Sequence, residues 1–592
     1  MSLIEIDHVT FQYPGAAAPS LNDVSLTIEQ GDFVAIMGGN GSGKTTMCKL
    51  LNGLIPHYYV GDIEGEIIVD GIKTLERKVT DLSQSVGYVY QDFENQLVRA
   101  KVIEDASYSP LNFGHMDYLD RGKKALEKVG LVGKDDEYIW ELSGGQKHLL
   151  ALAGAVSLEP KILIVDEPVA QLDPQHAKEL YDVLKFLNEK EDTTVIVIEH
   201  HTEFVAEYCK NVVLMADSRV LWKKEVKEGL TRVSEMRERD IFPPQVTQAA
   251  HVLSQKEGRM LPINLEEAAN YFQTYQIPEY KPTILEAKPK QVKEKLVEIQ
   301  SVDFSYKMIT REKKKILNGI DLTVHKGDRI ALVGNNGAGK STLMRLMTAL
   351  DKPETGDVLL KGQNTKSASP EKFADLVTYI YQNPEEMFID DSIKADIEYF
   401  LKARDKENYS EIVERILELF HLKEIQDRDG RLLSGGQQRR ASLAIGVAME
   451  PSLILLDEPT ANLDIGTRKH IARFIQSLKD QAEAVIIATH DMQLVAEWAN
   501  RIIVMRNGQI IHDGNRETVF SNKALLDQAG LTPPQIMELT RALGTKLAYS
   551  VEDFVAYVNE SKEEEAISGT NQRTSRDVEE IQEPYKEAAR LH

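Results

Sequence analysis

Two glycine-rich segments of the chain share one pattern, and each ends in a lysine followed by a hydroxyl side chain. The first is Gly38-Gly39-Asn40-Gly41-Ser42-Gly43-Lys44-Thr45, and the second is Gly334-Asn335-Asn336-Gly337-Ala338-Gly339-Lys340-Ser341. Glycines allow successive backbone N–H groups to converge on phosphate oxygens, and the positive end of a following helix strengthens that attraction. A lysine in this place reaches the β- and γ-phosphates of a nucleotide, and the hydroxyl binds Mg²⁺. The residues that we expect to hold the nucleotide are Gly38, Asn40, Gly41, Ser42, Gly43, Lys44, Thr45 and Thr46 in the first loop and Gly334, Asn336, Gly337, Ala338, Gly339, Lys340, Ser341 and Thr342 in the second.

An acidic pair and a later histidine recur in both halves. Asp166-Glu167 and Asp457-Glu458 each follow an apolar run of strand length. The aspartate at the end of such a strand is expected near the metal, and the glutamate can orient or deprotonate the water that attacks the γ-phosphate. His200 and His490 follow the next apolar strand, from which an imidazole can sense the γ-phosphate. We therefore predict these two glutamates and two histidines as catalytic residues. His201, the neighbour of His200, corresponds to Asp491 in the second half, and we leave it unassigned at the surface.

Glutamines and tyrosines also recur at matched positions. Gln91 and Gln382 each follow a Tyr in a predicted strand end, and we interpret them as sensors of the metal and of the attacking water. Tyr13 and Tyr306 lie near the start of each half and can stack on adenine. The less favoured alternative is a packed aromatic residue near a turn. A third repeat, Leu-Ser-Gly-Gly-Gln, occurs at 142–146 and at 433–437.

Each glycine-rich loop lies between a predicted strand and a predicted helix. The strands Phe33–Met37 and Arg329–Val333 run into the loops, and the helices Thr45–Leu54 and Ser341–Leu350 leave them. The continuously apolar runs are typical of a parallel sheet that is buried on both faces, which predicts an α/β fold. These runs are Ile162–Val165, Val195–Ile198, Leu453–Leu456 and Val485–Ala488. Mostly helical stretches at 92–155 and 383–445 are predicted as inserted subdomains.

The ordered duplication predicts two nucleotide-binding domains in one polypeptide. A fainter repeat after each core, Pro243-Pro244-Gln245 and Pro533-Pro534-Gln535, predicts a small appendage on each. The predicted segments are 1–225 for the first nucleotide-binding domain, 226–295 for its appendage and a linker, 296–516 for the second domain, 517–559 for its appendage and 560–592 for a disordered tail.

Composition restricts the class of protein further. The 592 residues carry a formal net charge of −23, which disfavours nucleic acid as a partner. The two cysteines, Cys48 and Cys209, cannot assemble a zinc site or an iron–sulfur cluster, and we predict them as small buried residues. We see neither a membrane-spanning apolar run nor a signal peptide, and we expect a cytoplasmic protein.

Taken in order, these motifs and the pairs Leu172-Asp173 and Leu463-Asp464 resemble the ATP-binding cassette (ABC) ATPases over about 1–225 and 296–516. The resemblance implies two P-loop NTPase domains, each with a RecA-like core, a helical subdomain and an antiparallel β subdomain. It implies an ATPase with ATP and Mg²⁺ as cofactors, whose metal is bound by Thr45, Gln91 and Asp166 at one site and by Ser341, Gln382 and Asp457 at the other.

In that family two cassettes meet head to tail, so the resemblance also implies that the two halves pair within this chain. One ATP site then combines Lys44, Gln91, Glu167 and His200 with Ser434, Gly435, Gly436 and Gln437. The other combines Lys340, Gln382, Glu458 and His490 with Ser143, Gly144, Gly145 and Gln146. Departures from the family pattern fall in the first half, where Glu199 precedes His200 and Lys147-His148 follows the first Leu-Ser-Gly-Gly-Gln. These departures make equal turnover at the two sites an open question.

Three tasks are compatible with such an ATPase pair: a membrane importer, an enzyme acting on ribosomes and a DNA-repair enzyme. The acidic net charge, the short linker and the lack of cysteine-rich modules favour the importer. The segments Tyr381–Phe388 and Tyr90–Leu97, together with the Pro-Pro-Gln appendages, resemble the ATPases of energy-coupling factor (ECF) transporters. That resemblance implies a peripheral place on the cytoplasmic face of the cell membrane. It also implies two partners, a transmembrane T-type coupling subunit and a substrate-binding membrane protein. Vitamin or transition-metal uptake follows from it, with thiamine precursors as the weakest inference, and a fused sugar-importer ATPase is the alternative.

Overall fold

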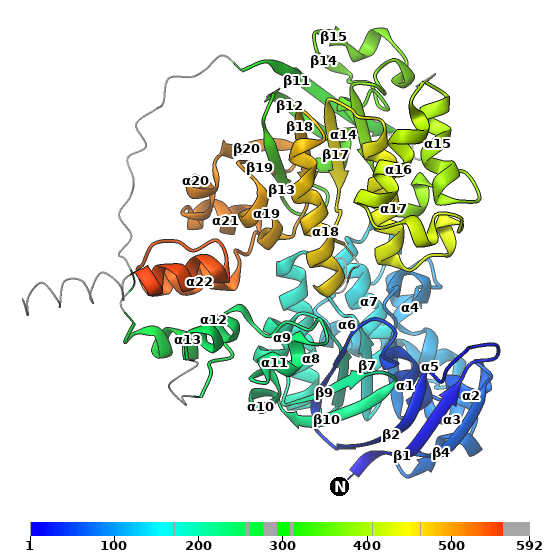
Figure 1. The fold of residues 1–592 in the computed structure, drawn as a ribbon. Coiled ribbons are helices and arrows are strands. Elements are labelled where there is room, and N and C mark those ends of the chain that lie inside the picture. The colour runs from blue at the N-terminus through cyan, green and yellow to red at the C-terminus, as the bar shows by residue number, and fades with distance from the viewer. Residues whose placement is uncertain are drawn as a thin grey trace, which may run out of the picture. The chain divides into compact units, whose positions relative to one another are not determined.

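The computed structural model describes residues 2–169, 172–254, 260–275, 277, 293–307, 313–404, 407–461, 463 and 465–560. Asp464, most of the predicted linker and all of the predicted tail except residue 560 lie outside these ranges. The chain divides into two compact units, one with Met1–Phe242 and Pro289–Thr532, the other with Pro243–Lys288 and Pro533–His592. We call the described parts of the first unit cassette 1, up to Phe242, and cassette 2, from 293 to Thr532 (Figure 1).

Cassette 1 is built on a six-stranded sheet in the order β10-β9-β3-β8-β7-β6. Strands β3, β6, β7, β8 and β9 run parallel, and β10 is antiparallel at the edge. A second, four-stranded antiparallel sheet has the order β2-β1-β4-β5. The strands are β1 (Ser2–Gln12), β2 (Leu21–Glu29), β3 (Phe33–Gly38), β4 (Asp62–Val69), β5 (Ile72–Lys73), β6 (Val86–Val89), β7 (Ile162–Asp166), β8 (Thr194–Ile198), β9 (Asn211–Ala216) and β10 (Arg219–Glu225).

Cassette 2 repeats both sheets, in the orders β16-β17-β18-β13-β19-β20 and β12-β11-β14-β15. The predicted α/β class and the antiparallel β subdomain are therefore confirmed. The strands are β11 (Lys295–Lys307), β12 (Lys313–His325), β13 (Arg329–Val333), β14 (Thr355–Leu360), β15 (Gln363–Asn364), β16 (Val377–Ile380), β17 (Leu453–Asp457), β18 (Ala484–Ala488), β19 (Arg501–Arg506) and β20 (Gln509–Gly514).

Parallel strands that are buried on both faces form the centre of each cassette. Every residue of β7, β8, β17 and β18 is buried, as the continuous apolar runs predict. In each cassette an apolar cluster of buried residues lies between the two sheets and includes the helix that follows the glycine-rich loop. Those helices are α1 (Lys44–Leu51) and α14 (Lys340–Met347). Cys48 and Cys209 are both buried, as predicted.

The helix after the first loop is shorter than its apolar spacing predicts. We expected it to continue to Leu54, but it ends at Leu51, and Gly53 has a φ of 74°. A left-handed glycine ends a helix because it costs no Cβ clash there. In cassette 2 the helix expected to reach Leu350 ends at Met347, and Ala349 has a left-handed φ of 61° although it carries a Cβ.

Helices inserted between the core strands form a subdomain in each cassette. In cassette 1 they are η2 (Phe93–Gln96), α4 (Val102–Ala106), α5 (Tyr108–Asn112), α6 (Tyr118–Lys128) and α7 (Gly144–Val156). In cassette 2 they are η6 (Pro384–Met387), α15 (Ile393–Lys402), α16 (Tyr409–Leu419) and α17 (Gly435–Ala448). The helices after the acidic pairs are α8 (Pro174–Lys190) and α18 (Ile465–Ser477). Within the described residues, no helix is both long and apolar enough to cross a membrane.

The second unit brings together the two Pro-Pro-Gln appendages. It contains α12 (Gln245–Leu253), α13 (Leu265–Phe272), α22 (Gln535–Ala542) and a helix at 551–560. Apolar side chains from both appendages form one cluster, in which the rings of Phe272 and Phe554 meet edge to face at a centroid distance of 5.0 Å. The appendages therefore share one core, although they lie about 290 residues apart in the sequence.

Candidate nucleotide-binding sites

The glycine-rich loops connect β3 to α1 and β13 to α14, and their backbone geometry requires glycine at the last position before the lysine. Gly43 has a φ of 96°, and a Cβ there would lie 2.5 Å from the backbone oxygen of Ser20. Gly339 has a φ of 100° and would place a Cβ 2.7 Å from Leu317. The loop can therefore close around an anion only without a side chain at these positions.

Both lysines of the loops are buried and are held by the loop itself. Lys44 Nζ donates to the backbone oxygens of Gly38 (2.8 Å) and Gly39 (2.9 Å). Lys340 Nζ donates to Gly334 O (2.6 Å) and to Asn335 O. Burial lowers the pKa of Lys340, and the carboxylates of Glu458 and Asp457 oppose this effect. Each ammonium group is thus oriented toward the loop interior, where phosphate would bind.

A hydroxyl faces the buried aspartate in each cassette. Thr45 hydrogen-bonds Asp166, and Ser341 hydrogen-bonds Asp457. Burial raises the pKa of both carboxyl groups, and these hydrogen bonds partly counteract it. Within the described residues no cluster of three or more His, Cys, Asp or Glu could hold a metal alone. A hydroxyl and one carboxylate do fit Mg²⁺, which is usually bound by one or two carboxylates together with the phosphates of its nucleotide.

Tyrosines in β6 and β16 also contact these aspartates, which the sequence did not lead us to expect. Tyr88 Oη donates to Asp166 (3.2 Å), and Tyr379 Oη donates to Asp457 (2.6 Å). The matched spacing of three residues before each predicted glutamine was the available signal. Each tyrosine fixes one carboxylate oxygen and leaves the other side of the group for the hydroxyl and a metal.

The predicted general bases occupy a strained backbone position. Glu167 has a φ of 50° and Glu458 a φ of 43°, in the left-handed region that residues with a side chain rarely adopt. Their backbone N–H groups donate to Ile198 O (3.0 Å) and Ala488 O (2.9 Å) on the adjacent strands. Such strain persists only where neighbouring structure fixes it, and it is concentrated at functional sites.

The predicted histidines contact the predicted bases, but through different ring atoms. In cassette 1, His200 Nε2 lies 3.3 Å from Glu167, and Gln91 Nε2 donates to the other carboxylate oxygen at 2.7 Å. In cassette 2, His490 Nδ1 lies 2.9 Å from Glu458. Burial favours neutral forms of both groups there, yet their mutual attraction lowers the pKa of Glu458 and raises that of His490. The structure therefore brings Gln91, Glu167 and His200 into contact, and likewise Glu458 and His490.

Each Leu-Ser-Gly-Gly-Gln segment forms the N-terminus of a long helix. Ser143 Oγ accepts a hydrogen bond from Gln146 N (3.2 Å), and Gln146 Oε1 accepts one from Ser143 N (3.1 Å), which forms a capping box at the start of α7. Ser434 and Gln437 form the same box at α17. Ser143 and Gly144 are exposed, and so are Ser434 and Gly435. Both segments thus present a helix N-terminus that suits an anion.

The aromatic residues expected at adenine lie at the edge of each site. Tyr13 packs edge to face on Phe11 at 4.7 Å, and its hydroxyl lies 3.4 Å from Thr46 Oγ1. Tyr306 packs in the same way on Phe304 at 4.9 Å and donates a hydrogen bond to Asp351.

His201, which the sequence left unassigned at the surface, contacts a buried carboxylate. Its Nδ1 lies 2.9 Å from the buried carboxylate of Glu199, which also accepts hydrogen bonds from the backbone N–H groups of His200 and His201. In cassette 2 the hydroxyl of Thr489 accepts a hydrogen bond from Asp491 N instead. The side chain before each predicted catalytic histidine thus fixes the loop after the strand, and His201 is one of several hydrogen-bond partners of the buried Glu199.

Comparison with known proteins places these sites in a family. The family described as "ABC transporter" matches residues 21–170 and 317–461. An ABC transporter ATP-binding protein of Caldanaerobacter subterraneus subsp. tengcongensis is 32% identical over 93% of this chain and 98% of its own length. One from Methanosarcina acetivorans is 33% identical over 90% of this chain and 89% of its own length.

Among solved structures, the chain is similar to cbiO1 from Clostridium perfringens, described as part of the ABC transporter complex cbiONQ. The two are 29% identical, with a TM-score of 0.37, over 43% of this chain and 99% of the other. The long alignments with relatives of similar length and the two matched segments confirm the duplicated cassettes that the motifs predict. The chain belongs to the ABC transporter family, as an ATP-binding ATPase with two cassettes.

Proposed function

We propose that the chain is the ATP-hydrolysing subunit of a membrane importer of the energy-coupling factor type, acting at the cytoplasmic face of the membrane. The observation that carries the proposal is the completeness of both hydrolytic centres. Glu167 and Glu458 each follow a buried aspartate, contact a histidine and hold the same strained backbone. A motor that uses two ATP molecules per cycle needs both centres.

In this proposal ATP binds with Mg²⁺ at two composite sites. The lysine, aspartate and glutamine of one cassette face the Leu-Ser-Gly-Gly-Gln segment of the other. Mg²⁺, held by Thr45 and Asp166 or by Ser341 and Asp457, neutralises charge on the β- and γ-phosphates when it is bound. Glu167 and Glu458 orient and deprotonate the attacking water, and His200 and His490 hold these carboxylates toward the γ-phosphate. Replacing both glutamates by glutamine should keep ATP binding and abolish turnover.

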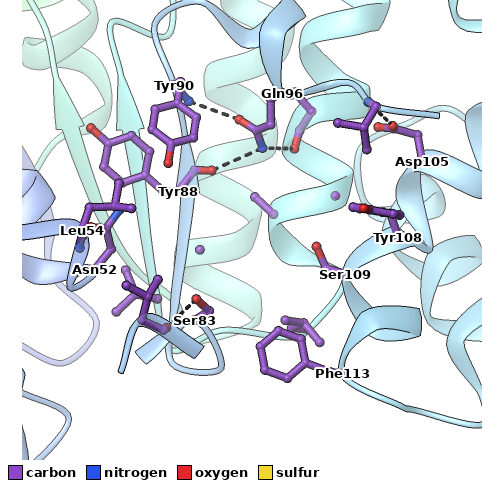
Figure 2. Close-up of a pocket in the computed structure, with 18 residues that line it drawn as sticks. Asn52, Leu54, Ser83, Tyr88, Tyr90, Gln96, Asp105, Tyr108, Ser109 and Phe113 are labelled. Atoms are coloured by element: carbon purple, nitrogen blue, oxygen red, sulfur yellow. Dashed lines mark hydrogen bonds between the residues drawn. The ribbon is translucent and has the colours of Figure 1, made fainter. Parts of the chain in front are cut away.

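A groove beside Gln91, the predicted sensor glutamine of cassette 1, supports a membrane partner. A cavity of about 270 Å³ lies between β6 and the helical subdomain of cassette 1. Figure 2 shows Tyr88, Tyr90, Asn52 and Leu54 along one wall and Tyr108, Ser109 and Phe113 along the other. Tyr90 is 38% exposed, and the exposed Tyr58 and Tyr59 lie close enough to help raise its pKa, after burial.

This groove begins one residue before Gln91, so that a helix seated in it would contact the segment that carries a predicted metal and water sensor. A surface that combines aromatic anchors with polar groups suits a helix from another protein. The T-type coupling subunit is the partner that we propose for it. A separate substrate-binding membrane protein would then choose the cargo, for which we propose vitamins or transition-metal ions, with thiamine precursors as the first to test.

Affinity purification from detergent-solubilised membranes of the host, followed by mass spectrometry, tests the proposal. We expect a multi-span coupling subunit and a small substrate-binding membrane protein to copurify, and Tyr90→Glu to release them. Met116→Glu is the matched control, because Met116 is 96% exposed and does not line the cavity. Copurification with ribosomes, or with the membrane subunits of a sugar importer, would contradict the ECF assignment.

A further inference from the structure

The two cassettes carry different side chains at one position of the helix that begins at Leu-Ser-Gly-Gly-Gln. This position follows the last glutamine of that segment by two residues, and it holds His148 in α7 and Arg439 in α17. Both side chains are almost fully buried, with exposures of 1% and 3%. Both face the segment that carries the predicted sensor glutamine, but they hold it in different ways.

Arg439 links α17 directly to the glutamine segment of cassette 2. Its guanidinium donates to the backbone oxygens of Tyr381 (2.9 Å) and of Gln382 itself. Burial lowers the pKa of Arg439 to about 10, and the nearby carboxylates of Asp457 and Glu458 oppose this, so the group stays charged at neutral pH. Hydrogen bonds from a charged, buried donor are stronger than those between neutral groups. They fix the backbone of Gln382 to the helix.

His148 makes no such link in cassette 1. Its ring stacks on Phe93 at a centroid distance of 4.3 Å, and within the described residues neither ring nitrogen has a hydrogen-bond partner. Burial lowers the pKa of His148 to about 4, so the imidazole is neutral at pH 7. A stacked neutral ring can slide on its partner, whereas two hydrogen bonds to carbonyl groups define a position.

Weaker contacts hold the corresponding segment of cassette 1. The side chain of Gln96 bonds Tyr90 N, Tyr88 O and Ala151 O at 3.3 to 3.4 Å (Figure 2). The equivalent position in cassette 2, five residues after the sensor glutamine, is the buried apolar Met387. A half-exposed ion pair between Lys147 and Glu94 adds a contact of 2.8 Å. None of these bonds reaches the backbone of Gln91.

We propose that Arg439 is a positioning residue that fixes Gln382 for metal coordination, and that cassette 1, with His148 in its place, holds Gln91 loosely. The inference rests on the proposed role of these glutamines as metal ligands. It assigns a built-in difference between the two ATP sites. The metal at the site of Lys340 is bound by a pre-positioned ligand, whereas the metal at the site of Lys44 must first order its glutamine, and this ordering costs affinity.

Gln91 itself supports this distinction. Its side chain donates to Glu167 at 2.7 Å, so it is engaged with the general base and must turn away before its oxygen can bind a metal. In cassette 2 the described residues place His490 on Glu458, and the glutamine is held only by its backbone. Glu167 thus competes with the metal for the side chain of Gln91.

Mn²⁺ binding to the full chain tests the proposal without relying on hydrolysis. The background is the Glu167→Gln, Glu458→Gln variant loaded with ATP, in which turnover is blocked and the predicted metal ligands are intact. Titration with Mn²⁺, followed by electron paramagnetic resonance, should resolve a tighter and a weaker site. Arg439→His should weaken the tighter site about tenfold, the effect of losing one charge-assisted hydrogen bond, and leave the other unchanged. Arg439→Lys should restore part of the affinity.

His148→Arg is the reciprocal variant, and it should tighten the weaker site. Gln382→Ala tests the metal-ligand role of Gln382 separately from the positioning role of Arg439. If Gln382→Ala weakens one Mn²⁺ site but Arg439→His and Arg439→Lys do not, the proposed role of Arg439 is wrong. If Gln382→Ala changes neither site, the role of the glutamine as a ligand fails. Equal weakening of both sites by Arg439→His would show a general loss of structure, and would also overturn the proposal.

Discussion

The two appendages of the second unit are joined by a reciprocal pair of hydrogen bonds. The side-chain oxygen of Gln245 accepts from the backbone N–H of Ile536 at 2.9 Å, and that of Gln535 accepts from Val246 N–H at 3.2 Å. Val246 and Ile536 are fully buried, and each lies in the first turn of its helix, where the N–H group has no partner within the helix. Each glutamine therefore caps the helix of the other appendage.

Replacing Gln245 by alanine should therefore destabilise α22, although Gln245 lies in α12 and is distant from α22 in the sequence. The change leaves a buried N–H group at Ile536 without a partner, which costs about 1–3 kcal/mol. At 1.4 kcal/mol per factor of ten, amide exchange in the first turns of α22 should accelerate about fivefold to a hundredfold. Alanine has a higher helix propensity than glutamine, so α12 itself should change little.

Hydrogen exchange of the full chain, read by mass spectrometry of peptides from α12 and α22, measures both helices at once. Gln535→Ala should give the mirrored result, with faster exchange in α12. Gln273→Ala is the matched control, because Gln273 is exposed in the same unit. If Gln245→Ala accelerates exchange only in α12, or in neither helix, the reciprocal capping is refuted.

Three further predictions concern the cassettes. The Glu167→Gln, Glu458→Gln variant should retain ATP in a filter-binding assay and lose phosphate release, whereas appreciable hydrolysis would show another base. Gly43→Ala should abolish ATP binding at the first site, because its φ of 96° and the 2.5 Å approach to Ser20 O leave no room for a Cβ; unchanged binding would contradict that geometry. The ion pair of Glu458 and His490 should make stability depend on pH. The raised pKa of His490 contributes stability that is complete below its usual value of 6.5 and is lost as the pH rises through the raised pKa. The lowered pKa of Glu458 contributes stability that is complete above its usual value of 4.5 and is lost as the pH falls through the lowered pKa. Thermal denaturation of wild type and His490→Ala should therefore differ most between these values, and a difference independent of pH would contradict the coupling.

The glycine-rich loops, the acidic pairs and the parallel core strands could be predicted because local residue types determine them. A continuous apolar run such as Leu453–Leu456 has few alternatives to a buried strand, and the aspartate after it must lie at the sheet edge. The left-handed backbone of Glu167 and Glu458 could not be predicted, because it is imposed by hydrogen bonds to strands that are distant in the sequence. The same holds for His201, whose partner Glu199 lies two residues earlier in the sequence but is buried only by the fold.

The predicted catalytic residues have the same identities in both cassettes, yet the structure shows different contacts around each predicted base. Glu167 accepts a hydrogen bond from Gln91 and lies 3.3 Å from His200 Nε2, whereas Glu458 lies 2.9 Å from His490 Nδ1. A ring nitrogen that faces the carboxylate leaves the other nitrogen for the γ-phosphate, so the two histidines present different atoms to the nucleotide. Gln91 must leave Glu167 before it binds a metal, and Gln382 need not. The hydrogen bond of Gln91 to Glu167 places an additional rearrangement at the first site, so that occupation of the site of Lys340 should precede closure at the site of Lys44. Sequence identity at every catalytic position is thus compatible with an ordered use of the two ATP molecules.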